Sequence, residues 1–344
     1  MGPPPAVAEV RSAVRRCLGE FAEGDLVLAA CSGGADSLAL AAALAHEGPR
    51  CGLRAGGVTV DHGLQPGSGD RAREVTRVLT GLGLKPVACL RAVVPAGPGN
   101  GGPEAAARTA RYTALADAAH RTGAVAVLLA HSRDDQAESV LLGLARGSGT
   151  RSLAGMPSRR GPYRRPLLGV ARATLRAACA ALDLRPWDDP QNEDPAFARV
   201  RVRQQALPAL EDALGPGITE ALARSAGQLQ ADAYVLEELA VSQAERVRDG
   251  DGGWQADLLA GLPDAIRTRV LRQAAVGAGC PPGALTAGHI DALDALVTSW
   301  HGQRWADLPG GVRCQRQRGR LLFIAGHPSE PAGNRASEGP VGRD

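Results

Sequence analysis

Long apolar runs are absent from this 344-residue sequence. No stretch of 18 or more apolar residues occurs, which excludes a membrane-spanning helix and predicts a protein with no membrane partner. The opening residues hold no uninterrupted apolar segment behind a basic one, so they lack the pattern of a secretory signal. We therefore expect a cytoplasmic protein.

Paired cysteines are also lacking. Seven cysteines are scattered along the chain, with no CxxC spacing among them and no histidine at the spacing of a zinc ligand. The pattern argues against a structural zinc site and predicts reduced, mostly buried thiols.

Lysine and aromatic residues are scarce. Lys85 is the only lysine, and Phe, Tyr and Trp together make 3% of the chain. The net charge of +3 is too small to indicate nucleic-acid binding by itself, but arginines gather in three clusters, at 159–165, 199–203 and 313–320. Guanidinium groups suit phosphate oxygens, so the clusters favour RNA contact carried by charge more than by stacking. The alternative is a genome that uses arginine in place of lysine.

The first 190 residues alternate between short apolar runs and longer helical patterns. Strands are expected at 25–30, 54–60, 86–90 and 125–130, and helices at 37–46, 69–82, 104–121 and 133–146. Unbroken apolar strands are typical of a parallel sheet covered on both faces. The expected fold class is therefore α/β, a doubly wound mainly parallel sheet, which binds ligands at the carboxyl ends of its strands.

The rest of the chain predicts a smaller domain. A long helix is expected at 218–248, shorter helices at 266–276 and 287–297, and a hairpin at 313–324. The expected organisation is an α/β domain at 1–214, a mainly helical domain at 215–326 and a disordered tail at 327–344.

A glycine-rich turn follows the first expected strand. Between an apolar strand and an apolar helix the chain reads Ser32, Gly33, Gly34, Ala35, Asp36 and Ser37. Such a turn aims successive backbone N–H groups at one point, and the following helix adds its positive N-terminal end. The glycines allow the close approach of an anion, the serine hydroxyls can donate to phosphate, and Asp36 can hold a magnesium ion or orient a substrate. The turn therefore predicts a phosphate-binding loop.

Other readings of this turn fit less well. No lysine follows the glycines, as a Walker loop requires, and the spacing does not match the GxGxxG of dinucleotide-binding folds. The structural alternative is a strand-to-helix turn in which Asp36 or Ser37 only caps the helix.

The turn resembles the SGGxDS signature of the PP-loop ATP pyrophosphatases. Further stretches resemble, in order and spacing, the tRNA(Ile)-lysidine synthetases of that superfamily: VDHGL at 60–64, EAAARTARY at 104–112, LAHSRDDQAES at 129–139 and RPLL at 165–168. The resemblance is strong over about 25–210 and weaker over 262–272 and 308–322.

The resemblance implies a reaction. ATP is cleaved between its α and β phosphates, and AMP is joined to the carbonyl of the wobble cytidine in an isoleucine tRNA with a CAU anticodon. The side-chain amine of L-lysine then displaces AMP and gives lysidine. ATP and Mg²⁺ are the implied cofactors, and the tRNA and L-lysine are the implied partners. The oligomeric state is left open, with a homodimer among the alternatives.

The resemblance also implies site residues. Asp135 and Glu138 lie three apart on an expected helix and share one face, where the family recognises lysine. Asp135 is also a candidate catalytic carboxylate, against the alternative of a solvated acidic helix start. Asp36, the expected metal ligand, is a second catalytic candidate. Arg108 and Arg111 are the others, because they can stabilise phosphate charge or the adenylated base.

The remaining candidates bind the nucleotide and the tRNA. Asp61 and His62 follow the second strand at the expected ligand edge and join residues 32–37 as ATP- and pyrophosphate-binding residues. A histidine there is as often a hydrogen-bonded structural residue, and an arginine run is often a solvated surface. The expected tRNA-binding residues are Arg199, Arg201, Arg203, Arg316 and Arg318.

Two other functions stay open at the level of sequence. A tRNA thiolation enzyme on the same fold is the nearest, although such enzymes generally rely on paired cysteines. A non-catalytic nucleotide- or RNA-binding module is the second, and the presence of Asp36, Asp135 and Glu138 argues against it.

Overall fold

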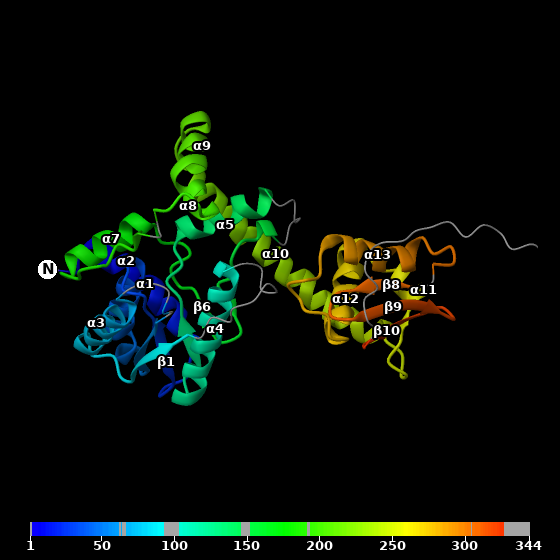
Figure 1. The fold of residues 1–344 in the computed structure, drawn as a ribbon, viewed down its shortest axis with the longest axis horizontal. Coiled ribbons are helices and arrows are strands. Elements are labelled where there is room, and N and C mark those ends of the chain that lie inside the picture. The colour runs from blue at the N-terminus through cyan, green and yellow to red at the C-terminus, as the bar shows by residue number, and fades with distance from the viewer. Residues whose placement is uncertain are drawn as a thin grey trace, which may run out of the picture. The chain divides into compact units, whose positions relative to one another are not determined.

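The computed structural model describes residues 2–61, 63, 67–92, 103–145, 152–190, 193–303 and 305–326, and only the backbone of 103–107. The chain divides into two compact units, Met1–Gln230 (unit 1) and Ala231–Asp344 (unit 2) (Figure 1). The division falls inside helix α10 (Ile218–Val247). The domain limits expected from the sequence place the boundary just before this helix and stay a prediction, and the expected tail at 327–344 lies outside the described residues.

Unit 1 is built on a six-stranded sheet. Its strands lie in the order β3-β2-β1-β4-β6-β5, and all neighbours run parallel except β5 and β6. The mainly parallel α/β sheet expected from the sequence is confirmed. The chain order reverses between β1 and β4, and ligands bind at such a switch point, beyond the carboxyl ends of the strands. The strands are β1 (Leu26–Ala30), β2 (Arg54–Asp61), β3 (Val87–Arg91), β4 (Ala126–Leu128), β5 (Arg159–Arg160) and β6 (Tyr163–Arg164).

Helices cover both faces of this sheet. Val27 and Ala29 of β1 belong to one core together with residues of α1, α2, α3 and α7, whereas Leu26 and Leu28 pack with α4 on the other face. Successive strand residues point to opposite faces, so an entirely apolar strand is stable only when both are covered. The elements between and after the strands are α1 (Pro5–Leu18), α2 (Ala35–Glu47), the 3₁₀ turn η1 (Pro49–Cys51), α3 (Ser68–Gly81), α4 (Pro103–Thr122), α5 (Arg133–Ala145) and α7 (Arg172–Ala181).

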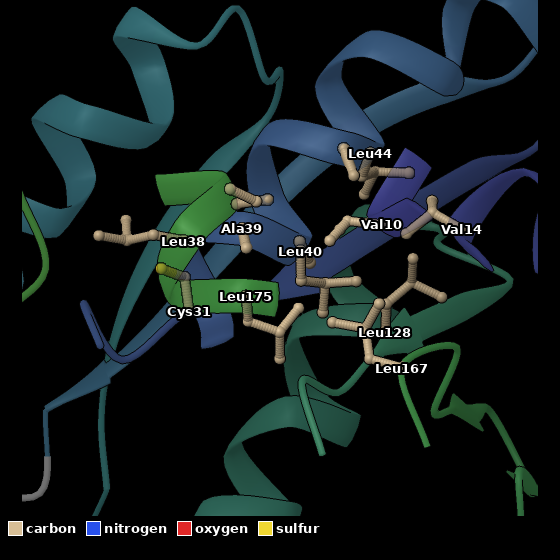
Figure 2. Packing of buried hydrophobic residues seen from close by; sticks show 14 of the residues in the cluster. Val10, Val14, Cys31, Leu38, Ala39, Leu40, Leu44, Leu128, Leu167 and Leu175 are labelled. Carbon is tan, nitrogen blue, oxygen red and sulfur yellow. The ribbon is translucent and has the colours of Figure 1, made fainter. Parts of the chain in front are cut away.

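The larger core holds α2 on the sheet. Figure 2 shows Leu40 of α2 among Val10 and Val14 of α1, Leu128 of β4 and Leu175 of α7, and each of these side chains is at most 2% exposed. Truncation of a leucine buried to this degree costs about 2–5 kcal/mol. The packing therefore fixes the N-terminus of α2, and with it the turn that joins β1 to α2.

An irregular helical run follows α7. It consists of α8 (Ala198–Arg201), the π-helical turn η3 (Val202–Ala206) and α9 (Leu207–Leu214). Pro208 lies just after the π turn and has no N–H to donate to the preceding turn, which favours a break in regular helical bonding. The longest helix, α10, comes next with 30 residues. Neither α10 nor any other helix among the described residues is long and apolar enough to cross a membrane.

Unit 2 combines helices with a sheet. Its helices after α10 are α11 (Ala256–Ala260), α12 (Asp264–Gly277) and α13 (Ala287–Thr298), and its four strands form an antiparallel sheet in the order β7-β10-β9-β8. The expected hairpin is present as β9 (Val312–Gln317) and β10 (Arg320–Ile324). The expected helices are present, but the expectation of a mainly helical domain did not include a sheet, which β7 (Trp254–Gln255) and β8 (Ala306–Leu308) complete around the hairpin. Strands of two or three residues are too short to show an alternating pattern in a sequence.

A substitution in β2 tests the packing of the sheet. A Cβ at Gly56 would lie 2.6 Å from Leu28 Cδ2 and 2.7 Å from the Pro86 carbonyl oxygen, which the Gly57 N–H holds at 2.9 Å. Because that carbonyl cannot move freely, we expect Gly56→Ala to lower the free energy of unfolding by about 1–3 kcal/mol in urea denaturation.

The matched control is the same substitution in a helix. A Cβ at the exposed Gly227 of α10 would meet no atom within 4 Å. Gly227→Ala should stabilise the protein by about 0.5–1 kcal/mol, since alanine loses less backbone entropy in a helix. Wild-type stability in Gly56→Ala would contradict the close packing at β2.

Candidate active site

The turn at 32–37 lies where β1 ends and α2 begins. Its first serine is held from within the turn, because the Ser32 N–H donates to Ser37 Oγ at 3.2 Å and Ser37 Oγ donates to the Gly34 carbonyl at 2.9 Å. The first helical bond of α2 runs from the Leu38 N–H to the Gly34 carbonyl. Helix geometry leaves the N–H groups of residues 35–37 without helical acceptors, so they are available to an anion.

Gly33 is required for the shape of this turn. Its φ is +89°, and a Cβ there would lie 2.9 Å from Val75 Cγ2 of α3. Its carbonyl accepts the Trp187 N–H at 2.9 Å. Gly34 differs, because its φ is −75° and a Cβ would meet nothing closer than the Trp187 carbonyl at 3.8 Å. The fold therefore needs the first glycine, and the second keeps the approach to the turn open.

A cavity of about 630 Å³ opens in front of the turn, within unit 1. It lies along the carboxyl ends of β1, β2 and β4, as the sheet topology predicts. Most expected site residues of unit 1 line it: Ser32, Gly34, Ala35, Asp36, Ser37, Asp61, Arg111, Asp135 and Arg203. Gly33 and Glu138 lie directly behind lining residues, and His62 lies outside the described residues.

A capping box orients Asp135. Its Oδ2 accepts the N–H of Ser132 at 2.8 Å and the Ser132 hydroxyl at 2.9 Å, so the side chain closes the first turn of α5. The neighbouring Asp134 caps another helix, because its Oδ2 accepts the Arg172 N–H at the start of α7 at 2.8 Å. Together these bonds tie the first turns of α5 and α7 to each other.

Arg172 joins the carboxylates of the site. Its Nη2 lies 2.8 Å from Asp135 Oδ1 and 3.3 Å from Glu138 Oε1, and its Nε lies 3.7 Å from Asp36 Oδ2. Arg203 completes the group through its Nε, 2.8 Å from Glu138 Oε1. The Glu138 side chain is fully buried between the two arginines. Three carboxylates thus face two guanidinium groups, which leaves one net negative charge.

The pKa values of Asp36 and Asp135 are shifted in opposite directions. Burial, reinforced by the charge of Asp135, raises the pKa of Asp36 from 3.8 to about 6. Burial also opposes ionisation of Asp135, but Arg172 and the Ser132 N–H outweigh it and hold the pKa of Asp135 below its ordinary value. Asp36 is therefore the carboxylate that takes up a proton first.

A second group of residues around the cavity is cationic. Arg111 and Tyr112 line it, the Arg108 guanidinium lies 5.2 Å from the Tyr112 ring centroid, and Arg165 Nη2 donates to Tyr112 Oη at 3.2 Å. Burial would raise the pKa of Tyr112, but these arginines lower it. Burial, together with the same arginines, lowers the pKa of His131 to about 3, so its imidazole is neutral. This part of the cavity can stabilise negative charge.

Four of the five expected tRNA-binding arginines already have partners. Arg199 Nη2 donates to Ser139 Oγ at 3.3 Å, and Arg201 Nη1 donates to the Pro195 carbonyl at 2.7 Å. In unit 2, Arg316 Nη1 donates to the Leu296 carbonyl at 3.0 Å and so caps the end of α13. Arg318 is exposed at the turn between β9 and β10, with φ of +50°.

Magnesium would fit this site as an ion to which the protein supplies only one carboxylate ligand. Among the described residues, no group of three or more Asp, Glu, His or Cys side chains is placed to hold a metal. Asp36 lines the cavity with its side chain 24% exposed. Because Mg²⁺ commonly takes one or two carboxylates and completes its shell with phosphates and water, one aspartate beside a phosphate-binding turn suits it.

Comparison with known proteins decides the family. A model described as the PP-loop domain matches residues 8–210, and one described as the TilS substrate binding domain matches residues 255–322. The tRNA(Ile)-lysidine synthase of Thermobifida fusca (strain YX) is 57% identical over 324 residues, which cover 94% of this chain and 99% of that protein. The chain belongs to the tRNA(Ile)-lysidine synthase family. The synthase of Streptomyces coelicolor is 53% identical over 95% of this chain and 100% of its own length. That of Salinispora arenicola is 55% identical over 95% of this chain and 98% of its own length.

A solved structure shares the fold. The U34-tRNA thiolase NcsA from Methanococcus maripaludis, with its 4Fe–4S cluster, matches 65% of this chain and 79% of its own with a TM-score of 0.55 and 19% identity. At this identity the similarity concerns the fold alone. The family resemblance inferred from the sequence is confirmed, and the thiolation alternative loses its support.

Sequence reasoning missed Arg172 and Trp187 as parts of the site. Arg172 lies 37 residues from Asp135 and 34 from Glu138, so no helical spacing relates them. Trp187 lies within residues 25–210, where the resemblance is strong, but only the structure shows that its N–H donates to the Gly33 carbonyl and that the Arg71 guanidinium lies 2.9 Å from its ring centroid. The one sequence signal for Arg172 is its place in the first turn of a helix, where a basic residue is unfavourable next to the helix dipole.

Removal of Arg172 tests the ion-pair group. Arg172→Gln leaves Asp36, Asp135 and Glu138 with one guanidinium, and loss of one partner of a buried pair costs about 3–5 kcal/mol. We expect a stability loss of that size in urea at pH 7.5. The loss should be smaller at pH 5, because the pKa of Asp36 is already raised to about 6 by burial, Arg172 is one of the groups that lower it, and without Arg172 this carboxyl is largely protonated there.

Arg176→Gln on the same helix is the control. The Arg176 side chain is 58% exposed and its partner Asp188 is 70% exposed, so the change should cost less than about 1 kcal/mol. Equal effects of the two substitutions would show that Arg172 has no special part in the site.

Proposed function

We propose that the protein is a tRNA(Ile)-lysidine synthase, an ATP-dependent ligase that adenylates the wobble cytidine of a CAU-anticodon isoleucine tRNA and joins L-lysine to it. The observation that carries the proposal is identity above 50% over almost the whole length of such synthases. The cavity beside the PP-loop turn supplies the groups that this chemistry needs.

The turn at 32–37 is the proposed site of the β and γ phosphates. The N–H groups of residues 35–37 form a fixed array of donors, which would stabilise the pyrophosphate as it leaves without reorganisation. Asp61, at the end of β2, is assigned to the nucleotide together with His62, which follows it in the sequence, and Asp36 is assigned to Mg²⁺. Asp36 would hold the ion, and the ion when bound would neutralise phosphate charge.

The cationic residues are proposed to act on the adenylation step. The C2 oxygen of cytidine attacks the α phosphorus of ATP, the bond to the bridging oxygen breaks, and pyrophosphate departs. Arg108 and Arg111 would stabilise the negative charge that develops on the phosphate. Neutral His131 lies beside them, so it adds no further positive charge that would repel the arginines.

Asp135 and Glu138 form the proposed lysine site. The lysine side-chain nitrogen attacks C2 of the adenylated cytidine, the C2–O bond breaks, and AMP leaves with that oxygen. The excess negative charge of the carboxylate group favours a bound ammonium. Asp135 lines the cavity and can contact lysine, whereas Glu138 positions Arg172 and Arg203 behind it. A carboxylate here also accepts the proton that the attacking amine releases.

The tRNA is proposed to contact both units. Arg203 lines the active-site cavity, and Arg199 and Arg201 are close to it in the sequence, although each of the three already has a partner within unit 1. In unit 2, exposed Arg318 is the better placed of the two expected arginines, since Arg316 caps α13. A tRNA substrate favours a cytoplasmic location, and a homodimer stays one arrangement for the enzyme.

Nucleoside analysis tests the reaction. A CAU-anticodon tRNA transcript incubated with the protein, ATP, Mg²⁺ and L-lysine should yield lysidine at the wobble position, detected by mass after digestion. The same transcript with uridine at that position should yield none. Consumption of ATP without lysidine in the first reaction would contradict the proposed ligation.

Asp36→Asn should separate stability from activity. The folded-state pKa of Asp36 is about 6 and lies above the ordinary 3.8, so ionisation of this carboxyl is less favourable in the folded protein than in the unfolded chain. Below about pH 4 the carboxyl is protonated in both states and has no such effect, and as pH rises through 6 its ionisation destabilises the fold. At pH 7.5 we expect the variant to be more stable than wild type by on the order of 2 kcal/mol, with the gain lost near pH 4. Its tRNA-dependent pyrophosphate release should fall to background, and release at the wild-type rate would remove Asp36 from the mechanism.

A further inference from the structure

Arg71 of α3 lines the active-site cavity, and one end of its guanidinium is buried without an acceptor. Other arginines that line the cavity are paired with carboxylates: Arg172 with Asp135, Arg176 with Asp188 and Arg203 with Glu138. By contrast, Arg71 Nη1 is buried and has no hydrogen-bond acceptor in the described part of the chain. A buried charged donor is costly without an acceptor, so its position in a cavity indicates a ligand that accepts from it.

Arg71 is held by the same groups that hold the phosphate-binding turn. Its guanidinium lies 2.9 Å from the centroid of the Trp187 ring, and the Trp187 N–H donates to the Gly33 carbonyl at 2.9 Å. Val75, one helical turn further along α3, lies against the same glycine, because a Cβ at Gly33 would be 2.9 Å from Val75 Cγ2. Residues four apart on a helix share one face. The face of α3 that carries Arg71 is therefore the one that packs beside the turn at 32–37.

The turn itself supplies no positive side chain. Residues 32–37 are two serines, two glycines, an alanine and an aspartate, and the only lysine of the chain is Lys85. The N–H groups at the start of a helix carry only partial charges, whereas pyrophosphate carries several full negative charges. A guanidinium adds a full positive charge, and its fork of donors suits phosphate oxygens. A free cation beside the turn is thus the group that an ATP phosphate would otherwise lack.

We propose that Arg71 binds the β and γ phosphates of ATP and the pyrophosphate that leaves. This assignment rests on the proposed function for the reaction and adds to it a residue that holds the leaving group. Nη1 is the donor that meets a phosphate oxygen. The contact with Trp187 holds the guanidinium in place before the nucleotide arrives, so little side-chain entropy is lost on binding.

The carboxylate of L-lysine is the other small anion of the proposed reaction. The contacts of Arg71 lead through Trp187 to Gly33, that is, to the turn. The carboxylates assigned to lysine belong to α5 and meet Arg172 and Arg203 instead. The positions of these contacts therefore favour phosphate over the lysine carboxylate as the partner of Arg71.

Binding of inorganic pyrophosphate tests the assignment without the reaction. In calorimetry at saturating Mg²⁺, Arg71→Met should weaken pyrophosphate binding by about 10- to 150-fold, the effect of one hydrogen bond between charged groups. Arg71→Lys should retain part of the affinity, because it keeps the charge and loses the fork of donors. AMP, which has neither the β nor the γ phosphate, should bind the wild type and Arg71→Met equally well. Equal AMP binding also shows that the variant is folded.

Arg77→Met on the same helix is the matched control. The Arg77 side chain is 73% exposed and pairs with Glu74, which is 56% exposed, so this variant should bind pyrophosphate as wild type. Unchanged pyrophosphate affinity in Arg71→Met would overturn the assignment, as would a wild-type protein that does not bind pyrophosphate. Equal loss of AMP and pyrophosphate affinity would overturn it too, because Arg71 would then support the nucleoside part of the site.

Steady-state kinetics separates the two anions. Arg71→Met should raise the KM for ATP and leave the KM for L-lysine unchanged. A higher KM for lysine with unchanged pyrophosphate affinity would assign Arg71 to the lysine carboxylate and overturn the proposal. Selective loss of pyrophosphate affinity in Arg71→Met, found in a protein whose wild type makes no lysidine, would sink the proposed function and leave the phosphate contact standing.

Discussion

Three carboxylates at the edge of a parallel sheet share two guanidinium groups, and the arrangement of the site depends on this balance. Arg172 touches Asp36, Asp135 and Glu138 and therefore ties α2 to α5 through α7. If every carboxylate had its own cation, no negative charge would be left for a positively charged substrate. If no cation were present, the buried carboxylates would be unpaired. The remaining negative charge is what a metal ion and the lysine ammonium would meet.

The same balance separates the pKa values of Asp36 and Asp135. Asp135 is held ionised by a helix cap and an arginine, whereas Asp36, with a longer contact to Arg172, has its pKa raised by burial. A pair of acids tuned apart by their surroundings can take different roles in one reaction. The turn that carries Asp36 is held by Gly33 from behind, so the position of the carboxylate follows from the packing of α2 and α3.

The two units differ in the charge that they carry. Unit 1 carries the catalytic cavity, and its residues hold most of the basic charge of the chain. Unit 2 carries a nearly balanced charge and the exposed tryptophans.

The sequence by itself determined the α/β class, the phosphate-binding turn and the family, because these depend on local patterns: apolar strands, glycines between a strand and a helix, and motifs at fixed spacing. The sequence pattern also predicted that Asp135 and Glu138 lie on one helix, which is α5. Only the tertiary structure decided which cations meet these carboxylates and that short β7 and β8 complete a sheet in unit 2. Such contacts join residues tens of positions apart in the sequence. They arise from the packing of helices and strands against one another, and local sequence patterns do not determine that packing.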